Sequence, residues 1–105
     1  MVRDAYVAIA DPTRREILEL LMDRGTAAAG QIAAEFPHLT RPAVSRHLRI
    51  LRECELVTAA RQGKAQNYSL NPAPIQNVQA WLQGFSRKQV KSLQTLREIV
   101  EQNPD

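Results

Sequence analysis

Residues 39–57, LTRPAVSRHLRILRECELV, limit how this chain can fold more than any other segment. The apolar residues recur at the spacing of one face of an α-helix: Val44, Leu48 and Leu51. The serine and most of the arginines fall on or beside the opposite face: Arg41, Ser45, Arg46, Arg49 and Arg52. Thr40 is a suitable N-cap, and Pro42 suits the first turn, where its missing N–H costs no hydrogen bond. We therefore predict a helix over residues 41–53 that packs by one side and presents guanidinium groups on the other.

Helical periodicity also marks three segments before this helix. Residues 2–9 have the spacing of a short amphipathic helix. The second helix follows Asp11 as its cap, has an apolar stripe of Ile17, Leu18 and Leu21, and stops at Gly25. A third is expected over residues 26–36, TAAAGQIAAEF, before Pro37 breaks the chain.

After the arginine-rich helix the apolar period becomes that of a strand. Residues 57–61 and 66–70 flank a QGK tip in which Gly63 can adopt a positive φ, which predicts a β-hairpin. Asn71 is then a suitable N-cap, and residues 72–102 are expected to form one long helix. Its apolar stripe comprises Ile75, Val78, Leu82, Phe85, Leu93 and Leu96. Little of the chain remains to cover that stripe, so it favours a helix-to-helix dimer seam.

These elements predict one mainly α domain over residues 1–105, with the order helix, helix, helix, helix, hairpin, helix. Its positive charge is local. Residues 36–70 contain six basic and two acidic residues, a net of +4, whereas the remainder has a net of −1. Charge gathered on one third of a chain of 105 residues indicates a face that binds a polyanion.

Residues 28–53 have the pattern of a helix-turn-helix, and residues 57–70 that of a basic wing. An α-helix fits the DNA major groove, where side chains can read base edges, while flanking cations hold phosphates. The outward residues near the helix start are expected to enter the groove: Arg41, Pro42, Ser45 and Arg46. Phosphate contacts are expected from Arg49, Arg52, Arg61 and Lys64.

Other chemistry finds little support in the sequence. The chain has one cysteine, no His-x-x-x-His pair and no glycine-rich phosphate loop, so we expect no catalytic site, metal or cofactor. Neither a secretory signal nor a membrane-spanning run is evident, and a reducing cytoplasm is the expected compartment. Cys54 is expected to be a small buried residue, and Trp81 and Phe85 are expected to pack in a core or dimer seam. His47 is expected to brace its helix or touch a phosphate.

Two alternatives remain at this stage. In one, the winged helix is a protein-interaction module whose basic face meets an acidic partner. In the other, the protein is a sensor that responds to a ligand, to oxidation of Cys54 or to a metal.

The segments ADPTRREILELL, RPAVSRHLRILRECELV and RQGKAQNYSLNP resemble the ArsR family of bacterial winged-helix repressors. The resemblance implies a homodimer built through residues 1–10 and 72–102, which binds a palindromic double-stranded DNA operator. Carried over by position, the recognition-helix motif falls on Arg41, Pro42, Ser45, Arg46 and His47, and the wing on residues 61–64. Together with the cap and helix faces above, the expected DNA-binding set is Thr40, Arg41, Pro42, Ser45, Arg46, His47, Arg49, Arg52, Arg61, Gly63 and Lys64. The apolar spacing of the first and last helices gives the expected dimer set: Val2, Tyr6, Ile9, Ile75, Val78, Leu82, Phe85, Leu93 and Leu96.

Three departures from the family pattern refine this expectation. Metal-responsive members have a cysteine motif where this chain has AAGQIAAEF, or ligands on the last helix, which here contains no histidine. The chain is thus similar to the non-metal autorepressor subgroup, some members of which are released from DNA by a partner protein. Many relatives also have glycine where this chain has Glu55. A non-glycine residue there predicts modest backbone strain, and a differently shaped junction or a weakened helix end.

Overall fold

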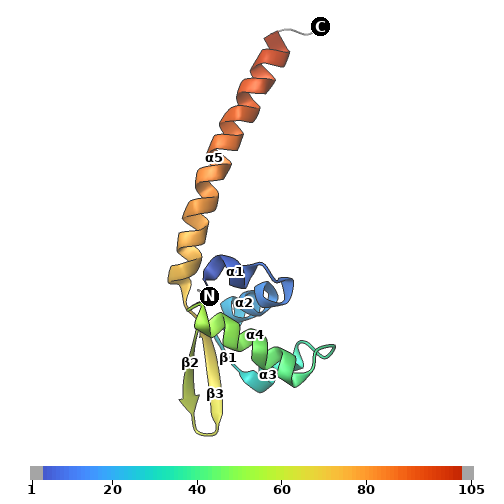
Figure 1. Ribbon diagram of the computed structural model, residues 1–105, viewed down its shortest axis with the longest axis vertical. Coiled ribbons are helices and arrows are strands. Elements are labelled where there is room, and N and C mark those ends of the chain that lie inside the picture. The colour runs from blue at the N-terminus through green and yellow to red at the C-terminus, as the bar shows by residue number, and fades with distance from the viewer. Residues whose placement is uncertain (1–3, 103–105) are drawn as a thin grey trace. The chain divides into compact units, whose positions relative to one another are not determined.

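The computed structural model describes the backbone of residues 4–102 and the side chains of residues 4–88. These residues form α1 (Ala5–Ile9), α2 (Pro12–Arg24), β1 (Thr26–Ala28), α3 (Ala29–Ala34), α4 (Arg41–Glu53), β2 (Val57–Gln62), β3 (Ala65–Leu70) and α5 (Pro72–Gln102) (Figure 1). The chain divides into two compact units, residues 1–75 and 76–105. The expected mainly α winged helix-turn-helix is confirmed, with one more strand than the sequence predicted.

The three strands form one antiparallel sheet in the order β1-β3-β2. β2 and β3 make the expected hairpin, with Val57 opposite Leu70 and Gln62 opposite Ala65. On the other edge of β3, Ala27 lies opposite Tyr68. The turn of the hairpin is the part of the sheet farthest from α1 and α2, so the wing extends from the helical part of this unit (Figure 1).

The prediction of a helix beginning at Thr26 was wrong, because Thr26–Ala28 form β1. The Thr26 hydroxyl donates a hydrogen bond to the Tyr68 carbonyl at 3.2 Å, in addition to the strand pairing. Partners so distant in the sequence leave no local signal, and a three-residue strand is too short to show alternation. Only α3 is helical in this segment, and its N-terminus is braced where the Ala28 N–H donates to Gln31 Oε1 at 2.8 Å.

The core of the first unit lies where α2, α3 and α4 pack together and against the sheet. Its largest fully buried side chains are Ile17, Leu21, Ile32, Leu48, Leu51, Leu56 and Val57. The predicted stripe of α2 is confirmed, since Ile17, Leu18 and Leu21 are all buried. Each buried aliphatic side chain contributes roughly 1.5–3 kcal/mol, so the core holds α4 by one face.

The predicted limits of α2 are also confirmed. Asp11 Oδ2 accepts a hydrogen bond from the Arg14 N–H at 3.0 Å, and Pro12 occupies the first turn. The helix ends at Gly25, whose φ of 81° lies in the region that favours glycine.

α5 begins at Pro72 and continues for 31 residues, as the apolar stripe predicted. Three residues of the expected dimer seam fall outside what the structure describes: Val2 altogether, and Leu93 and Leu96 in their side chains.

Candidate nucleic-acid interface

The recognition helix α4 has two chemically distinct faces, as its sequence predicted. Val44, Leu48 and Leu51 are buried against the core, and Ile50 is buried beside them. The expected outward residues are all exposed: Arg41, Ser45, Arg46, Arg49 and Arg52. Helical geometry puts these two groups about half a turn apart, so the packing that buries one group turns the other toward solvent.

The start of α4 has the predicted cap. Thr40 Oγ1 accepts a hydrogen bond from the Ala43 N–H at 3.2 Å, and Pro42 lies in the first turn. The hydroxyl of Thr40 is thus engaged by the backbone, while Arg41 and Pro42 are exposed at the N-terminal end. This end also carries the positive pole of the helix dipole, which favours a nearby anion.

The end of α4 adopts a left-handed cap on a residue that is not glycine. Glu55 has a φ of 61°, so the expected strained conformation is confirmed. The Glu55 N–H donates to the Arg52 carbonyl and the Leu56 N–H to the Leu51 carbonyl, both at 3.0 Å. This pair of bonds is the Schellman motif that glycine usually completes. The expectation of a differently shaped junction was therefore wrong, and a weakened helix end remains a prediction.

Asn71 closes the same junction from the end of β3, and sequence reasoning missed it. Its side-chain amide donates to the Glu55 carbonyl at 2.8 Å, and its backbone N–H donates to the Leu56 carbonyl at 2.9 Å. Asn71 was interpreted only as a helix cap for α5. The sixteen-residue separation from Glu55 explains why no local pattern could reveal the contact.

The wing places its basic residues near a tight turn. Gly63 has a φ of 63° at the first central position of the two-residue connection, where a type II′ turn requires glycine. Lys64 is the other central residue, and Arg61 lies on β2 opposite Gln66. All three are exposed. The Asn67 side chain donates to Gln62 Oε1 at 2.7 Å and ties the two strands beside the tip.

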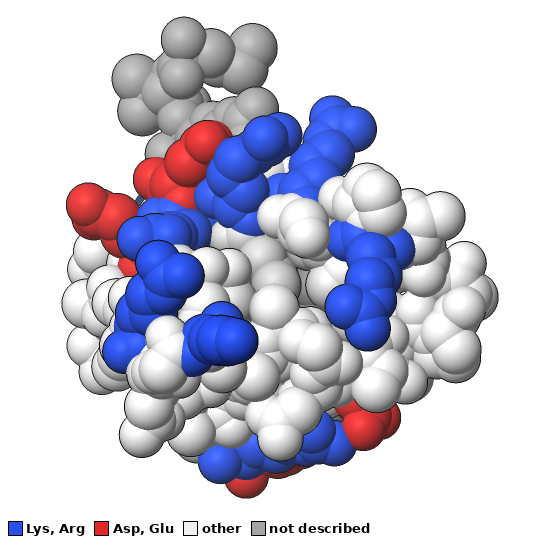
Figure 2. Space-filling model, turned by 90° about the horizontal axis from the view of Figure 1, so that it is seen from below, with Lys and Arg blue, Asp and Glu red and all other residues white. Residues whose placement is uncertain are grey.

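Viewed from the wing end, the molecule shows several groups of Lys and Arg side chains, whereas Asp and Glu lie toward the margins of the view (Figure 2). The basic residues of α4 and the wing all belong to the first unit. Exposed cations on two neighbouring elements are what a groove-binding helix and a flanking phosphate contact require.

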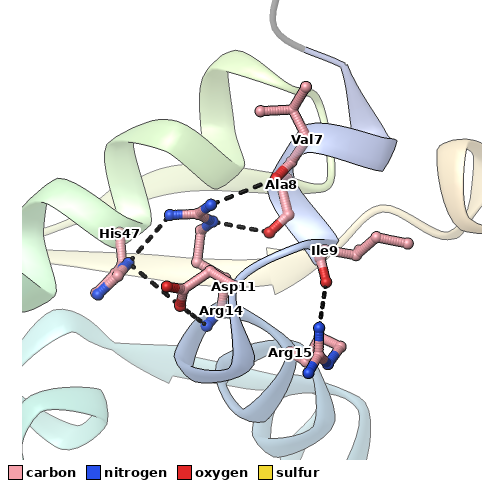
Figure 3. Close-up of polar contacts among 7 residues, drawn as sticks. All are labelled: Val7, Ala8, Ile9, Asp11, Arg14, Arg15 and His47. Atoms are coloured by element: carbon pink, nitrogen blue, oxygen red, sulfur yellow. Dashed lines mark hydrogen bonds and ion pairs between the residues drawn. The ribbon is translucent and has the colours of Figure 1, made fainter.

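His47 lies between the two faces of α4, with 18% of its side chain exposed. Its Nδ1 atom is 3.4 Å from Nη1 of Arg14 and 3.9 Å from Oδ2 of Asp11 (Figure 3). The first of its two expected roles, bracing the helix, is therefore observed. Contact between His47 and a phosphate stays a prediction.

The same neighbours change the pKa of the Asp11 carboxylate. Partial burial by itself raises the pKa of Asp11, but the hydrogen bond from the Arg14 N–H and the positive charge of Arg14 outweigh it, with further contributions from His47 and the Thr13 N–H. The net effect is a pKa below the usual value of an aspartate, so the cap carries its charge at neutral pH.

Arg14 and Arg15 have roles that the sequence did not suggest. Both reach back to backbone carbonyls at the end of α1. Arg14 Nε donates to the Ala8 carbonyl at 2.8 Å, and Arg15 Nη1 donates to the Ile9 carbonyl at 2.6 Å. A pair of arginines just after a short helix is a weak sign of such C-terminal capping.

Residues 11–59 match the model of the arsR family of bacterial regulatory proteins. The chain is 39% identical over 87 residues to the transcriptional repressor SdpR of Bacillus subtilis (strain 168), covering 83% of this chain and 94% of that protein. It is 38% identical to the HTH-type transcriptional regulator Rv2034 of Mycobacterium tuberculosis (strain ATCC 25618 / H37Rv), covering 77% of this chain and 74% of that protein. An ArsR-like transcriptional regulator from Rhodococcus sp. RHA1 has a similar structure, with a TM-score of 0.72 and 28% identity over 91% of this chain and 86% of that chain.

The chain belongs to the ArsR family. It is accordingly a DNA-binding transcriptional repressor, in which α3 and α4 form the helix-turn-helix and the β2–β3 hairpin forms the wing. The family model and these relatives describe transcriptional regulators rather than enzymes.

In this ArsR-family chain, the expected dimer residues differ in exposure. On α1, Tyr6 is exposed and Ile9 half-buried. On α5, Val78 is buried and Ile75 half-buried, whereas Trp81, Leu82 and Phe85 are 53%, 50% and 53% exposed. Trp81 and Phe85 stack edge to face with ring centroids 4.7 Å apart. So much exposed aromatic surface on adjacent turns is unusual for a helix that meets only solvent.

Cys54 is buried at the end of α4, as expected. Among the residues that the structure describes, no three His, Cys, Asp or Glu side chains cluster closely enough to hold a metal ion. In the same part of the chain, none of the helices combines the length and apolar character of a membrane span.

Proposed function

We propose that this ArsR-family repressor binds a palindromic operator as a homodimer, with one α4 helix in each of two successive major grooves. The observation that supports this most is the exposed arginine face of α4, held outward by the buried face of the same helix. Half-sites for two such helices should be about 34–36 Å apart, one turn of B-DNA.

Within this proposal, base edges are read by Arg41, Ser45 and Arg46. They lie nearest the N-terminal end of α4, which enters the groove first in helix-turn-helix proteins. Phosphates are held by Arg49 and Arg52 on α4 and by Arg61 and Lys64 on the wing. Thr40, Pro42, His47 and Gly63 complete the proposed interface by shaping or positioning these elements.

We further propose that the dimer forms through α1 and α5. Its support is the exposed apolar surface of α5 around Trp81, Leu82 and Phe85. A hollow of about 330 Å³ lies beside this aromatic pair, lined also by Ala80, Gly84 and Lys88. Small residues next to large ones are the knobs and holes that let two helices interlock.

We propose that the repressor is controlled by a signal other than a metal. As in the autorepressor subgroup, a partner protein releases it from DNA. A repressor that senses oxidation through Cys54 is less well supported, because that thiol is buried and reactive cysteines are at least partly exposed. The proposed site of action is the cytoplasm, where a bacterial operator would be met.

A salt titration tests the DNA-binding proposal. DNA duplexes can be selected from a random library by the wild-type protein, and binding can then be measured between 50 and 200 mM salt. If each subunit meets about three to five phosphates, log K should fall with log salt at a slope of roughly −5 to −9. The selected duplex should also show two inverted half-sites. A binding constant that does not change with salt concentration would contradict the proposal. Selection of a single unrepeated site would also contradict it.

A further inference from the structure

The Arg14 side chain joins three helices of the first unit. Its Nε donates to the Ala8 carbonyl at 2.8 Å and its Nη2 to the Val7 carbonyl at 3.3 Å, in the last turn of α1. Its Nη1 lies 3.4 Å from His47 Nδ1 on the recognition helix. Arg14 itself belongs to α2, so one guanidinium group connects α1, α2 and α4 (Figure 3).

The His47 ring is held by one of its two nitrogens. Nδ1 faces Arg14 and Asp11, and the other ring nitrogen points away from both (Figure 3). A guanidinium group can only donate hydrogen bonds. In its contact with Arg14, therefore, Nδ1 is the acceptor and the ring proton is on Nε2.

This contact can prevent a rotation of α4 about its own axis that apolar packing alone does not prevent. The buried face of α4 is entirely aliphatic, and aliphatic contacts are not directional. A hydrogen bond on the flank of the helix, by contrast, limits rotation about the helix axis because its geometry is narrow. Arg46 precedes His47 in the chain and Arg49 lies two residues after it, so such a rotation would displace both from their targets.

We propose that Arg14 and His47 are positioning residues for operator recognition, with Arg14 tying the recognition helix to the end of α1 through His47 Nδ1. In this role His47 acts on specificity without touching DNA itself. The inference rests on the proposed function, because a binding register matters only if α4 reads base edges. A site of this kind must be held to about 0.5 Å for its contacts to form.

Two substitutions of His47 distinguish the roles of its two ring nitrogens. Asparagine can place its carbonyl oxygen near the position of Nδ1 and accept from Arg14, whereas glutamine reaches the position of Nε2. We expect His47→Asn to keep operator affinity within about threefold of wild type. His47→Gln should weaken operator binding about tenfold, as for the loss of one hydrogen bond, and leave binding to random duplex unchanged.

Arg14 and Arg15 form a matched pair for the other end of the link. Both side chains cap carbonyls of α1. Of the two, only Arg14 also contacts α4 within the part of the chain that the structure describes. Arg14→Lys should lower the ratio of operator to random-DNA affinity about tenfold, and Arg15→Lys should leave the ratio unchanged. In the His47→Gln background, Arg14→Lys should have little further effect, since the link is already broken.

The salt slope distinguishes positioning from direct contact. Loss of a phosphate contact reduces the slope by about one and weakens operator and random DNA alike, whereas a positioning variant keeps the slope. A reduced slope for His47→Gln, or equal losses for His47→Asn and His47→Gln, would overturn the inference. An effect of Arg15→Lys as large as that of Arg14→Lys would also overturn it. Wild-type protein that binds selected and random duplex equally would instead refute the proposed function, before any variant is measured.

Discussion

One residue of this protein, Glu55, departs from the usual choice at the place where α4 ends. Glu55 takes the left-handed conformation that closes a helix, although glycine adopts it at lower cost. The bonds around it are those of an ordinary cap, so the strain lies in the residue and leaves the shape of the junction unchanged. The carbonyl of Glu55 accepts the Asn71 amide, which helps to hold the conformation.

Glu55→Gly should stabilise the protein by about 1 kcal/mol, because glycine removes the steric cost of the positive φ. The free energy of unfolding can be measured by urea denaturation at one fixed protein concentration. Glu55→Ala is the matched control, since it removes the negative charge from the helix end and keeps the Cβ atom. A gain from alanine as large as that from glycine would assign the cost to charge instead.

Asp11 makes a pH-dependent contribution to stability at the start of α2. Its pKa is lowered in the folded state, so its charged form stabilises the fold above the unfolded value of about 3.9. That contribution is lost as the pH falls through the lower pKa of the folded state. Asp11→Asn keeps a capping oxygen and removes the charge. The free energy of unfolding of this variant should be lower than that of wild type by a constant amount near neutral pH. The difference should shrink below about pH 4. A deficit that stays the same down to pH 2 would contradict this account.

At the scale of elements, the recognition helix and the wing are distinguished by how each is held. α4 is anchored by a buried aliphatic face, a capped N-terminus and a closed C-terminal junction. Among the residues that the structure describes, the β2–β3 turn is held by its own strand pairing, and side-chain bonds join Asn67 to Gln62 and Tyr68 to Gln66 nearby. A rigid helix suits base reading, which needs a fixed geometry, and a wing supported by its own strands suits contact with the uniform phosphate backbone.

Substitutions in these two elements should therefore have different signatures. Arg46→Ala should weaken operator binding by about 1–3 kcal/mol and affect random duplex less, as for loss of a base contact. Lys64→Ala should weaken both DNAs by similar factors and reduce the salt slope by about one. Mobility-shift titrations on both duplexes provide the comparison. Equal losses on both DNAs for Arg46→Ala would show that Arg46 meets only phosphate.

Across the whole molecule, the buried core and the exposed aromatic surface belong to different units. Residues 1–75 contain the helix-turn-helix, the wing and most of the buried side chains, whereas the exposed aromatic residues Trp81 and Phe85 belong to the second unit. A chain of this size buries only about two-thirds of its unfolded surface, so added burial between two copies would contribute substantially to stability.

Phe85→Glu should separate the proposed dimer, because a charge in an apolar seam must be desolvated without a partner. Sedimentation should then show a monomer, and operator affinity should fall by at least about 100-fold as the second half-site is lost. Gln83→Glu places the same charge on an exposed position of α5 and should leave both unchanged. A Phe85→Glu protein that remains dimeric would refute the proposed seam.

The sequence by itself determined the features that depend on neighbours within about one helical turn. Asp11 and Thr40 cap the helices that their positions predicted, and the two faces of α4 follow from its apolar spacing. Gly63 closes the hairpin where a positive φ was required. Such signals are local, since a cap or a face involves residues three or four apart.

Only the tertiary structure decided the contacts that join distant segments. Thr26–Ala28 became a strand because β3 offered a partner, and Asn71 lies beside Glu55 because the pairing of β2 with β3 puts Leu70 opposite Val57. Arg14 and His47, 33 residues apart in the chain, meet only because α2 and α4 pack together. Their side chains carry no periodic signal of each other, because the packing that brings them together is set by the aliphatic core rather than by the residues that meet.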